Sequence, residues 1–291
     1  MDNISLIAAC SSFGVNVNGV EKGAKVLLDK VEKNIKKYEV KNFEYTKENE
    51  KENKEKNLEA VNRFNLELYN KAKEVLKNND LPLTLGGDHS IAIASALASI
   101  SKYENLGIIW FDAHGDFNTF DTTITGNIHG LPLACITGYE RKKLTDFHKG
   151  NFYNAKNTVV VGARDLDDLE VLNLKDAGVT VFTTKDVYEK GVEAIVKEAL
   201  KIAGNGTNGI HISYDLDMID PKVAPGVSVP AEDGLTEKQA EDIVDVFLEY
   251  IDKIKSIDIV EFNPLNDIDG KTEKIALNII DKILGKEDKN K

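Results

Sequence analysis

Five short apolar runs in this sequence are each followed at once by residues that can bind metal ions or transfer protons. Because the carboxyl ends of parallel strands meet at one edge of an open sheet, side chains placed there converge from distant parts of the chain. The five polar segments are Gly86-Gly87-Asp88-His89-Ser90, Asp112-Ala113-His114-Gly115-Asp116, Gly162-Ala163-Arg164-Asp165-Leu166-Asp167, Asp215-Leu216-Asp217-Met218-Ile219-Asp220-Pro221 and Glu261-Phe262-Asn263-Pro264. Their shared position predicts one site rich in carboxylates and imidazoles.

Four aspartates of these segments cannot lie together in ionised form without positive charge between them. They are Asp112, Asp116, Asp215 and Asp217. Two divalent cations would supply that charge, and hard oxygen ligands with two imidazoles suit manganese or a neighbouring metal in the series. If the strands continue, the first and last residues of Asp-Ala-His-Gly-Asp and of Asp-Leu-Asp point the same way, so carboxylates can bridge ions about 3.5–4 Å apart that share one hydroxide. A single Asp-x-Asp more often caps a helix, but the joint occurrence of these motifs favours a dinuclear site.

The segments that position these motifs alternate between short β-branched runs and amphipathic stretches. The expected strands are 4–10, 38–45, 81–85, 106–111, 158–161, 179–183, 209–214 and 257–260, and the clearest helices are 24–37, 57–79, 192–203 and 236–253. Several runs are apolar throughout, which is typical of parallel strands covered on both faces. The alternation predicts a three-layer α/β/α fold with a central, mostly parallel eight-stranded sheet, in one domain spanning residues 1–291.

Composition and charge argue against two classes of partner. A net charge of −12 over 291 residues disfavours a nucleic-acid binder, which needs a basic face for phosphates. No apolar run reaches about 18 residues, so we expect no membrane span, and the N-terminus lacks a signal-peptide pattern. Cys10 and Cys135 lie in apolar stretches. They are expected to be buried thiols of a reducing compartment, which predicts a cytoplasmic protein.

Several other polar features are predicted to have no part in the chemistry. His211 lies inside an apolar strand run and is expected to be structural, whereas His148 is expected at the surface. The low-complexity segment 46–57 is expected to be a solvated loop or the exposed start of a helix, with a recognition segment as the alternative. The charged residues 286–291 are expected to form a fraying tail.

The metal motifs Gly-Gly-Asp-His-Ser, Asp-Ala-His-Gly-Asp and Ser-Tyr-Asp-Leu-Asp-Met-Ile-Asp-Pro together resemble those of the ureohydrolases, the family of arginase, agmatinase and formimidoylglutamase. The resemblance covers nearly the whole chain, from Gly19-Val20-Glu21-Lys22-Gly23 to Glu261-Phe262-Asn263-Pro264. It implies a three-layer parallel fold, assembly as a homotrimer or homohexamer, and two Mn²⁺ ions per chain. By this resemblance one ion would be held by His89, Asp112, Asp116 and Asp215, and the other by His114, Asp112, Asp215 and Asp217.

The stretch 118–130, Asn-Thr-Phe-Asp-Thr-Thr-Ile-Thr-Gly-Asn-Ile-His-Gly, is similar to the arginase branch of this family. The resemblance implies that Asn118 and Thr125 bind the α-carboxylate of an amino-acid substrate, with Asn127 also in the substrate site. Asp167 would then pair with the α-ammonium group, and Glu170 would lie near the same end. Agmatinases differ in this loop because their substrate has no α-carboxylate.

One position departs from the arginase pattern. In Pro225-Gly226-Val227-Ser228-Val229-Pro230, Val229 stands where arginases usually have a threonine. This segment looks closer to formimidoylglutamase and to some agmatinase-like members. The departure concerns the substrate and leaves the metal chemistry unchanged.

The reaction that the resemblance implies is manganese-dependent hydrolysis of the guanidinium group of L-arginine to L-ornithine and urea, by the hydroxide shared between the metals. Asp116 would orient the hydroxide, Glu261 would pair with the planar guanidinium in a two-point fork, and His129 would protonate the departing amine. Agmatinase, guanidinobutyrase and formimidoylglutamase activities stay open as alternatives. A non-catalytic homologue is disfavoured because every expected ligand is present, and a dinuclear phosphatase because no arginine- or lysine-rich loop adjoins the metal motifs.

Overall fold

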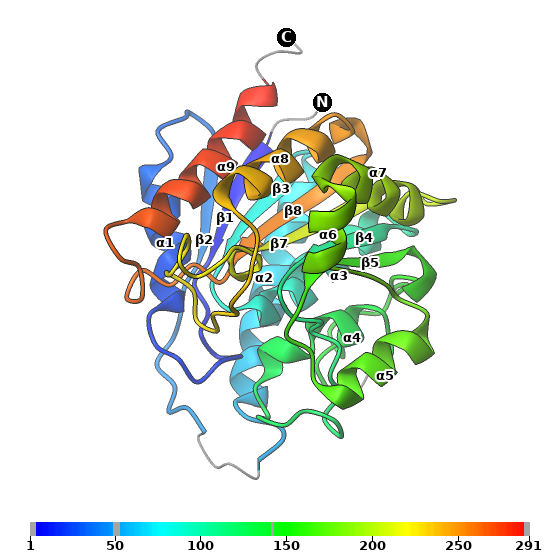
Figure 1. Cartoon of the computed structure of the whole chain (residues 1–291). Helices are drawn as coiled ribbons and strands as arrows, with labels where there is room; N and C mark the ends of the chain where they lie inside the picture. The colour runs from blue at the N-terminus through cyan, green and yellow to red at the C-terminus, as the bar shows by residue number, and fades with distance from the viewer. Residues whose placement is uncertain (1–3, 49–52, 141–142, 288–291) are drawn as a thin grey trace.

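An eight-stranded sheet forms the centre of the molecule (Figure 1). The computed structural model describes residues 4–48, 53–140 and 143–287. The strands lie in the order β2-β1-β3-β8-β7-β4-β5-β6, and each neighbouring pair is parallel. The expected mostly parallel sheet is therefore confirmed. The strand bounds are β1 Ile4–Ala9, β2 Lys36–Val40, β3 Leu81–Gly86, β4 Gly107–Phe111, β5 Thr158–Ala163, β6 Thr180–Thr183, β7 Ile210–Asp215 and β8 Ile254–Val260.

Helices cover both faces of the sheet, and each layer encloses its own hydrophobic core. One face carries α1 Val20–Lys30, α6 Thr184–Lys190, α7 Val192–Ala203, α8 Glu237–Leu248 and α9 Lys271–Glu287. The other carries α2 Leu58–Lys77, α3 Ala92–Tyr103, α4 Pro132–Ile136 and α5 Asp168–Ala177. In β4, Ile109 and Phe111 face the first core and Ile108 and Trp110 face the second, as the two-residue period of a strand requires. Burial of both faces explains why the strand sequences are apolar throughout.

Capping residues fix where two of these helices begin. At α8, the Thr236 hydroxyl accepts a hydrogen bond from the Gln239 amide, and the Gln239 side chain accepts one from the Thr236 amide. Asp167 and Glu170 form the same reciprocal arrangement at α5. Such a capping box satisfies two amide groups that the helix itself leaves unpaired. At α5 it also holds in place two acids that the sequence assigns to the substrate site.

The strand order brings the polar motifs to one edge of the sheet. Strands β3, β8, β7, β4 and β5 are consecutive neighbours, and each is followed directly by one of the five polar segments. All five segments therefore leave the sheet at its carboxyl edge, where open parallel sheets bind their ligands.

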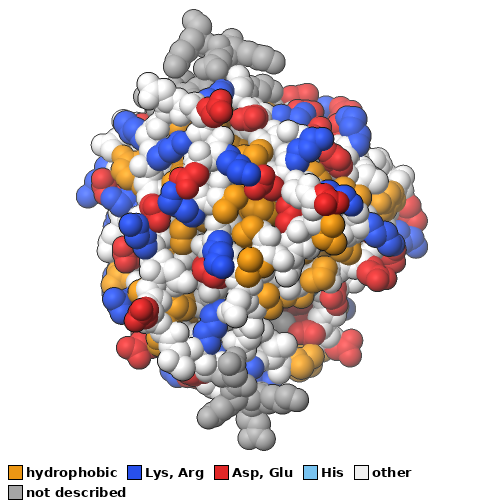
Figure 2. Space-filling model, turned by 90° about the vertical axis from the view of Figure 1, so that its left-hand side faces the viewer, with side chains coloured by type: hydrophobic (Ala, Val, Ile, Leu, Met, Phe, Trp, Pro, Cys, Tyr) orange, Lys and Arg blue, Asp and Glu red, His pale blue; other side chains and the backbone are white. Residues whose placement is uncertain are grey.

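Several element boundaries differ from the sequence expectation. The helix expected at 236–253 ends at Leu248, and the strand expected at 257–260 begins at Ile254. The strand expected at 38–45 is confined to Lys36–Val40, and the helix expected at 24–37 spans Val20–Lys30. The helix begins early because Glu21 in its first turn accepts a hydrogen bond from the Gly19 amide at 2.8 Å. In the described part of the chain, no helix combines the length and apolar character needed to cross a bilayer. On the face shown in Figure 2, acidic and basic side chains are interspersed.

His148 is buried, which contradicts the prediction from the sequence. It was expected at the surface, but its side chain is only 4 % exposed. Its Nδ1 lies 3.2 Å from the Tyr69 hydroxyl and its Nε2 lies 2.8 Å from the Asn151 carbonyl oxygen. The Phe152 ring packs edge-on against the imidazole. The two polar partners satisfy both ring nitrogens, and the aromatic neighbour packs against the ring. These contacts offset the free-energy cost of burying the imidazole.

Other expectations for single residues hold, and two segments are only partly described. His211 is buried in β7 with its Nδ1 2.6 Å from the Ser256 hydroxyl, which agrees with a structural role. Cys10 and Cys135 are free and buried, as expected. Of the segment 46–57, residues 49–52 lie outside the described residues, and Lys56 and Asn57 are buried instead of solvated. In the expected tail 286–291, α9 continues to Glu287 and residues 288–291 lie outside the described residues.

Candidate metal centre and substrate pocket

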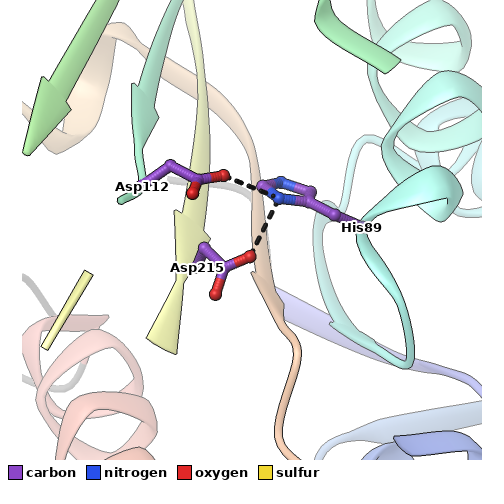
Figure 3. Close-up of side chains that lie close together, drawn as sticks. All are labelled: His89, Asp112 and Asp215. Atoms are coloured by element: carbon purple, nitrogen blue, oxygen red, sulfur yellow. Dashed lines mark ion pairs between the residues drawn. The ribbon is translucent and has the colours of Figure 1, made fainter. Parts of the chain in front are cut away.

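His89 lies at the centre of a cluster of carboxylates at the carboxyl edge of the sheet. It begins the short 3₁₀ helix His89–Ile91 after β3. Figure 3 shows the carboxylates of Asp112, which follows β4, and Asp215, which ends β7, both facing its ring. His89 Nδ1 lies 3.0 Å from Asp112 Oδ2, 3.0 Å from Asp215 Oδ2 and 3.1 Å from Asp116 Oδ2. Three carboxylates from two strands thus face one ring nitrogen.

The geometry around His89 Nδ1 suits a bound cation. This nitrogen is buried and satisfied by no hydrogen bond, although three carboxylate oxygens surround it. Ligands about 2.1 Å from an octahedral cation lie ~3.0 Å apart when they are neighbours, which matches these separations. The other ring nitrogen, Nε2, lies 2.8 Å from the Ser213 hydroxyl. If Nε2 carries the proton and donates it to Ser213, Nδ1 presents a lone pair to the same point as the carboxylates.

A second group of possible ligands shares Asp112 with the first. His114 Nδ1 lies 3.1 Å from Asp217 Oδ2 and 3.3 Å from Asp112 Oδ1. The ligand atoms of Asp112, His114 and Asp217 lie close enough together to hold one ion, as do those of His89, Asp112 and Asp215. Because the two oxygens of Asp112 face different histidines, its carboxylate is placed to bridge two cations. The structure therefore brings together all six residues that the sequence proposes as ligands.

The charges in this cluster need compensation. Burial, with the nearby Asp217 and Asp112, raises the pKa of Asp215 well above its usual value. Burial and the Asp112 carboxylate raise the pKa of Asp116 to about 6. Burial alone would lower the pKa of His89, but the surrounding carboxylates hold it well above its ordinary value. These directions show that the chain's own groups compete for too few positive charges, which two divalent ions would supply.

Two of the acids hold unusual backbone conformations. Asp116 has φ 48° and Glu261 has φ 66°, in the left-handed region that non-glycine residues rarely adopt. The Asp116 carbonyl accepts hydrogen bonds from the amides of Leu133 and Ala134 at the start of α4, and the Glu261 amide donates to the Gly87 carbonyl at 2.9 Å. Strained residues held by their surroundings cluster at functional sites, and both of these acids were assigned to the chemistry.

Glu261 and His129 lie next to each other beside the ligand cluster. Glu261 Oε1 accepts a hydrogen bond from the His89 amide at 2.8 Å and lies 3.2 Å from His129 Nδ1. The second oxygen, Oε2, is buried and has no hydrogen-bond partner. Burial alone would lower the pKa of His129, but the Glu261 carboxylate raises it above its ordinary value. One carboxylate oxygen is thus free for a ligand, while the other faces the His129 imidazole and favours its charged form.

A pocket of about 220 Å³ opens from the carboxylate cluster. Its size is below the range of about 300–1,000 Å³ typical of drug-sized ligands, so it suits a small molecule. Among the described residues that line it there is neither lysine nor arginine. The lining residues include His89, His114, Asp116, Asp215 and Asp217 at one end, and Asn118, Thr123, Thr125, Asn127, Asp165, Asp167, Glu170 and Val229 elsewhere, with His129 also present.

The residues proposed for the far end of a substrate are connected to each other. The Asn118 side-chain amide donates to Asp167 Oδ2 at 3.0 Å, and Asn118 Oδ1 accepts from the Thr122 hydroxyl at 2.9 Å. Glu170 is buried, and its two oxygens accept from the amides of Phe117 at 2.8 Å and Asp167 at 3.3 Å. Burial raises the pKa of Glu170 to about 8. These contacts make Glu170 a brace between the loop after β4 and the start of α5.

Three residues that support the site were not singled out from the sequence. The Trp110 ring stacks on His89 with centroids 4.0 Å apart, and its indole N–H donates to Asp112 Oδ2 at 2.9 Å. Ser213 partners His89 Nε2. The Arg164 guanidinium donates to backbone carbonyls of the loop after β7, including that of Asp217 at 2.8 Å. Trp110 and Ser213 had looked like ordinary strand residues, since nothing in the sequence shows that both contact one imidazole.

Comparison with known proteins agrees with this geometry. The model of the Arginase family matches residues 2–285. The chain is 37% identical over 232 residues to an arginase of Bacillus subtilis (strain 168), covering 79% of this chain and 78% of that protein. It is 32% identical to an arginase of Staphylococcus aureus (strain MSSA476), covering 97% of both chains. A solved structure of arginase from Bacillus caldovelox is 32% identical and superposes with a TM-score of 0.90, covering 98% of this chain and 99% of that one.

Proposed function

Since the chain belongs to the arginase family of amidinohydrolases, we propose that it hydrolyses L-arginine to L-ornithine and urea with two bound Mn²⁺ ions. The observation that carries this proposal is the pair of ligand groups that share Asp112 at the end of one small pocket. The described residues that line this pocket include neither lysine nor arginine, which a phosphate would need as partners. Carboxylate oxygens with one imidazole in each group suit manganese and its neighbours in the series.

Two ions held by the ligand groups of His89 and His114 would supply Lewis acidity, which makes water a nucleophile near neutral pH. The residues of the chain have to orient the water, bind the guanidinium group and transfer the proton. Asp116 has an oxygen among the ligands, so it can accept a hydrogen bond from the attacking water and aim it. Glu261 offers Oε2, which is buried and unpartnered, to an N–H group of the planar guanidinium.

Proton transfer completes the reaction. The water oxygen forms a bond to the guanidinium carbon, and the bond from that carbon to the side-chain nitrogen of arginine breaks. The departing nitrogen leaves as the amine of ornithine only if it gains a proton. His129 is in place to donate it, because Glu261 lies 3.2 Å from its Nδ1 and raises its pKa. Urea leaves with the water oxygen, and the two protons of that water restore the proton of His129 and convert the product amine to its ammonium form.

The far end of the pocket supports an amino-acid substrate. Thr123, Thr125 and Asn127 offer neutral polar groups on one loop, and Asp167 offers a negative charge at the start of α5. This pairing suits an α-carboxylate and an α-ammonium group respectively. Thr123 is buried, and a buried hydrogen-bonding group left without a partner loses about 1–3 kcal/mol. A substrate without the carboxylate should therefore bind and react less well.

A related amidine is the second candidate substrate, and Val229 is the observation that favours it. Its side chain lines the pocket, and its methyl groups present an apolar surface where a hydroxyl would bind a guanidinium nitrogen. Formimidoylglutamate, which carries fewer nitrogen donors at its reactive end, would lose less there than arginine. Agmatine and guanidinobutyrate share the guanidinium group and differ from arginine at the other end.

A substrate panel tests the proposal. The manganese-loaded protein would be assayed with arginine, agmatine, guanidinobutyrate and formimidoylglutamate, with urea and formamide measured as products. Urea from arginine at the highest kcat/KM supports the proposal. Formamide from formimidoylglutamate without urea from arginine would assign the protein to the second candidate.

We also propose where the protein acts and how it assembles. Two free, buried cysteines suit a reducing compartment, which supports a cytoplasmic location. Assembly as a homotrimer or homohexamer is part of this proposal, and large apolar side chains exposed on α5 offer contact area for another subunit: Leu169, Val171 and Leu172. Light scattering of the purified protein would measure the number of subunits.

A further inference from the structure

A lysine-rich segment packs behind the loop that forms the far end of the pocket. Lys54 and Lys56 belong to the low-complexity run that the sequence suggested was solvated. Lys56 is only 6 % exposed, and its Nζ donates to the Thr125 carbonyl at 2.5 Å. Lys54 Nζ donates to the Thr123 carbonyl and, at 3.2 Å, to the Ile124 carbonyl. Two ammonium groups thus bind three consecutive carbonyls of the pocket loop.

The segment is fixed where it meets the rest of the fold. Asn57, just before α2, is 1 % exposed, and its side-chain amide donates to the Phe13 carbonyl at 2.9 Å. Asn57 Oδ1 accepts a hydrogen bond from the Glu48 amide at 2.7 Å. The segment also approaches the loop closely at Gly126, which has φ +75° and whose missing Cβ would lie 2.1 Å from the Asn53 carbonyl oxygen. Only glycine satisfies both conditions.

These contacts fix which way the loop presents its polar groups. A peptide unit is planar and trans, so a carbonyl held toward the lysines turns the next N–H to the opposite side. Within the loop, the Gly126 amide donates to the Thr123 hydroxyl at 3.0 Å, and the Asn127 amide donates to the Thr125 hydroxyl at 3.2 Å. Thr123, Thr125 and Asn127 all line the pocket. The lysines therefore support the loop from the side away from the pocket.

Charge gives the same residues a second role. The described lining of the pocket contains no lysine or arginine. It contains six acids: Asp116, Asp165, Asp167, Glu170, Asp215 and Asp217. At the far end, a substrate carboxylate would lie near the Asp167 carboxylate, with no cation in the described lining to offset its charge. Lys56 places a buried positive charge directly behind Thr125, and burial weakens solvent screening of that charge.

We propose that Lys54 and Lys56 are positioning residues that determine specificity for a substrate carboxylate. They hold the loop 123–127 in its binding shape, and they supply the positive charge that the pocket lining lacks. This inference rests on the proposed function, which places the α-carboxylate at this loop.

The test replaces the ammonium group and keeps the aliphatic stem. In Lys56→Met, KM for arginine should rise about tenfold or more, since a charge-assisted contact is lost, while kcat changes less than about threefold. KM for agmatine, which has no carboxylate, should stay the same. Lys37→Met is the matched control, because the Lys37 ammonium binds the Leu28 carbonyl at 2.9 Å and the Val31 carbonyl beside α1.

A readout that does not need turnover accompanies the kinetics. Amide hydrogen exchange of residues 119–127 should become faster in Lys56→Met and stay at the wild-type rate in Lys37→Met. Equal KM changes for arginine and agmatine, or unchanged exchange in the loop, would overturn the inference. If the wild-type protein hydrolyses no arginine, the proposed function fails instead, and the exchange measurement alone then decides whether the lysines hold the loop.

Discussion

Replacing Ser213 by alanine is a direct test of how the fold prepares His89 for a metal ion. Ser213 is buried in β7, and its hydroxyl lies 2.8 Å from His89 Nε2. If a metal binds at Nδ1, the ring proton must lie on Nε2, and the Ser213 hydroxyl then accepts a hydrogen bond from this N–H. Without a metal, the proton can instead sit on Nδ1 among the three carboxylates. Removing the hydroxyl therefore penalises the metal-bound state selectively.

The size of the effect follows from the lost partner. A buried N–H left without an acceptor loses about 1–3 kcal/mol, which corresponds to a ~5- to 150-fold weaker metal affinity. Losses of about 10- to 100-fold are usual when a residue that orients a metal ligand is changed. The cavity left by one hydroxyl is small, so the stability of the metal-free protein should change little.

Metal titration measures this prediction. Manganese would be added to the metal-free protein while heat release and the thermal midpoint are recorded. Ser99→Ala in α3 is the matched control, because Ser99 is equally buried but bonds only the Ser95 carbonyl of its own helix. If Ser213→Ala binds manganese as tightly as wild type, or if both variants weaken binding alike, the argument about the His89 tautomer is wrong.

Three further predictions concern other parts of the site. Asp215→Ala should abolish turnover and lower the metal content measured by atomic emission, because the remaining ligands compensate two cations poorly; two ions per chain with normal turnover would contradict it. His129→Asn should lower kcat by about 10²–10⁴ with metal content unchanged, and an unaltered pH–rate profile would exclude proton donation by this residue. Burial raises the pKa of Glu170 from 4.5 to about 8, so between these values the folded state holds a proton that the unfolded state has released. This contribution to stability is complete below pH about 4.5 and is lost as pH rises to about 8, at about 1.4 kcal/mol per pH unit. Urea unfolding of the metal-loaded protein should therefore show a smaller fall in stability across this window in Glu170→Gln than in wild type; equal falls would contradict this.

Much of the fold and the grouping of the candidate ligands could be predicted from the sequence because both depend on local patterns. Continuous apolar runs identified the parallel strands, and the polar residues directly after them had to lie at one edge of the sheet. Asp112 and Asp215 are examples, since each stands at the end of its strand. The ends of strands and helices were harder to predict. The strand β2 ends at Val40 although Phe43 and Tyr45 favour a strand, because its pairing with β1 ends at Val40.

The supporting residues could not be predicted because their roles depend on contacts between distant segments. Trp110 reads as a core residue, and only the fold shows its ring on His89 and its indole N–H on Asp112. The sequence predicts that Lys56 belongs to a solvated charged segment. Only the fold shows that its ammonium group donates a hydrogen bond to the Thr125 carbonyl. His148 was misplaced for the same reason, since its cover comes from Tyr69 in α2.

The comparison of arginine with agmatine tests the central claim most directly. The two substrates share the guanidinium group and differ by the α-carboxylate that the loop 123–127 is proposed to bind. With the manganese-loaded protein, kcat/KM measured from urea release should be at least about tenfold higher for arginine than for agmatine. The buried Thr123 hydroxyl would lose a partner with agmatine, and such a loss is about 1–3 kcal/mol. Equal or faster hydrolysis of agmatine would contradict the account of the substrate, whatever the metal content of the site.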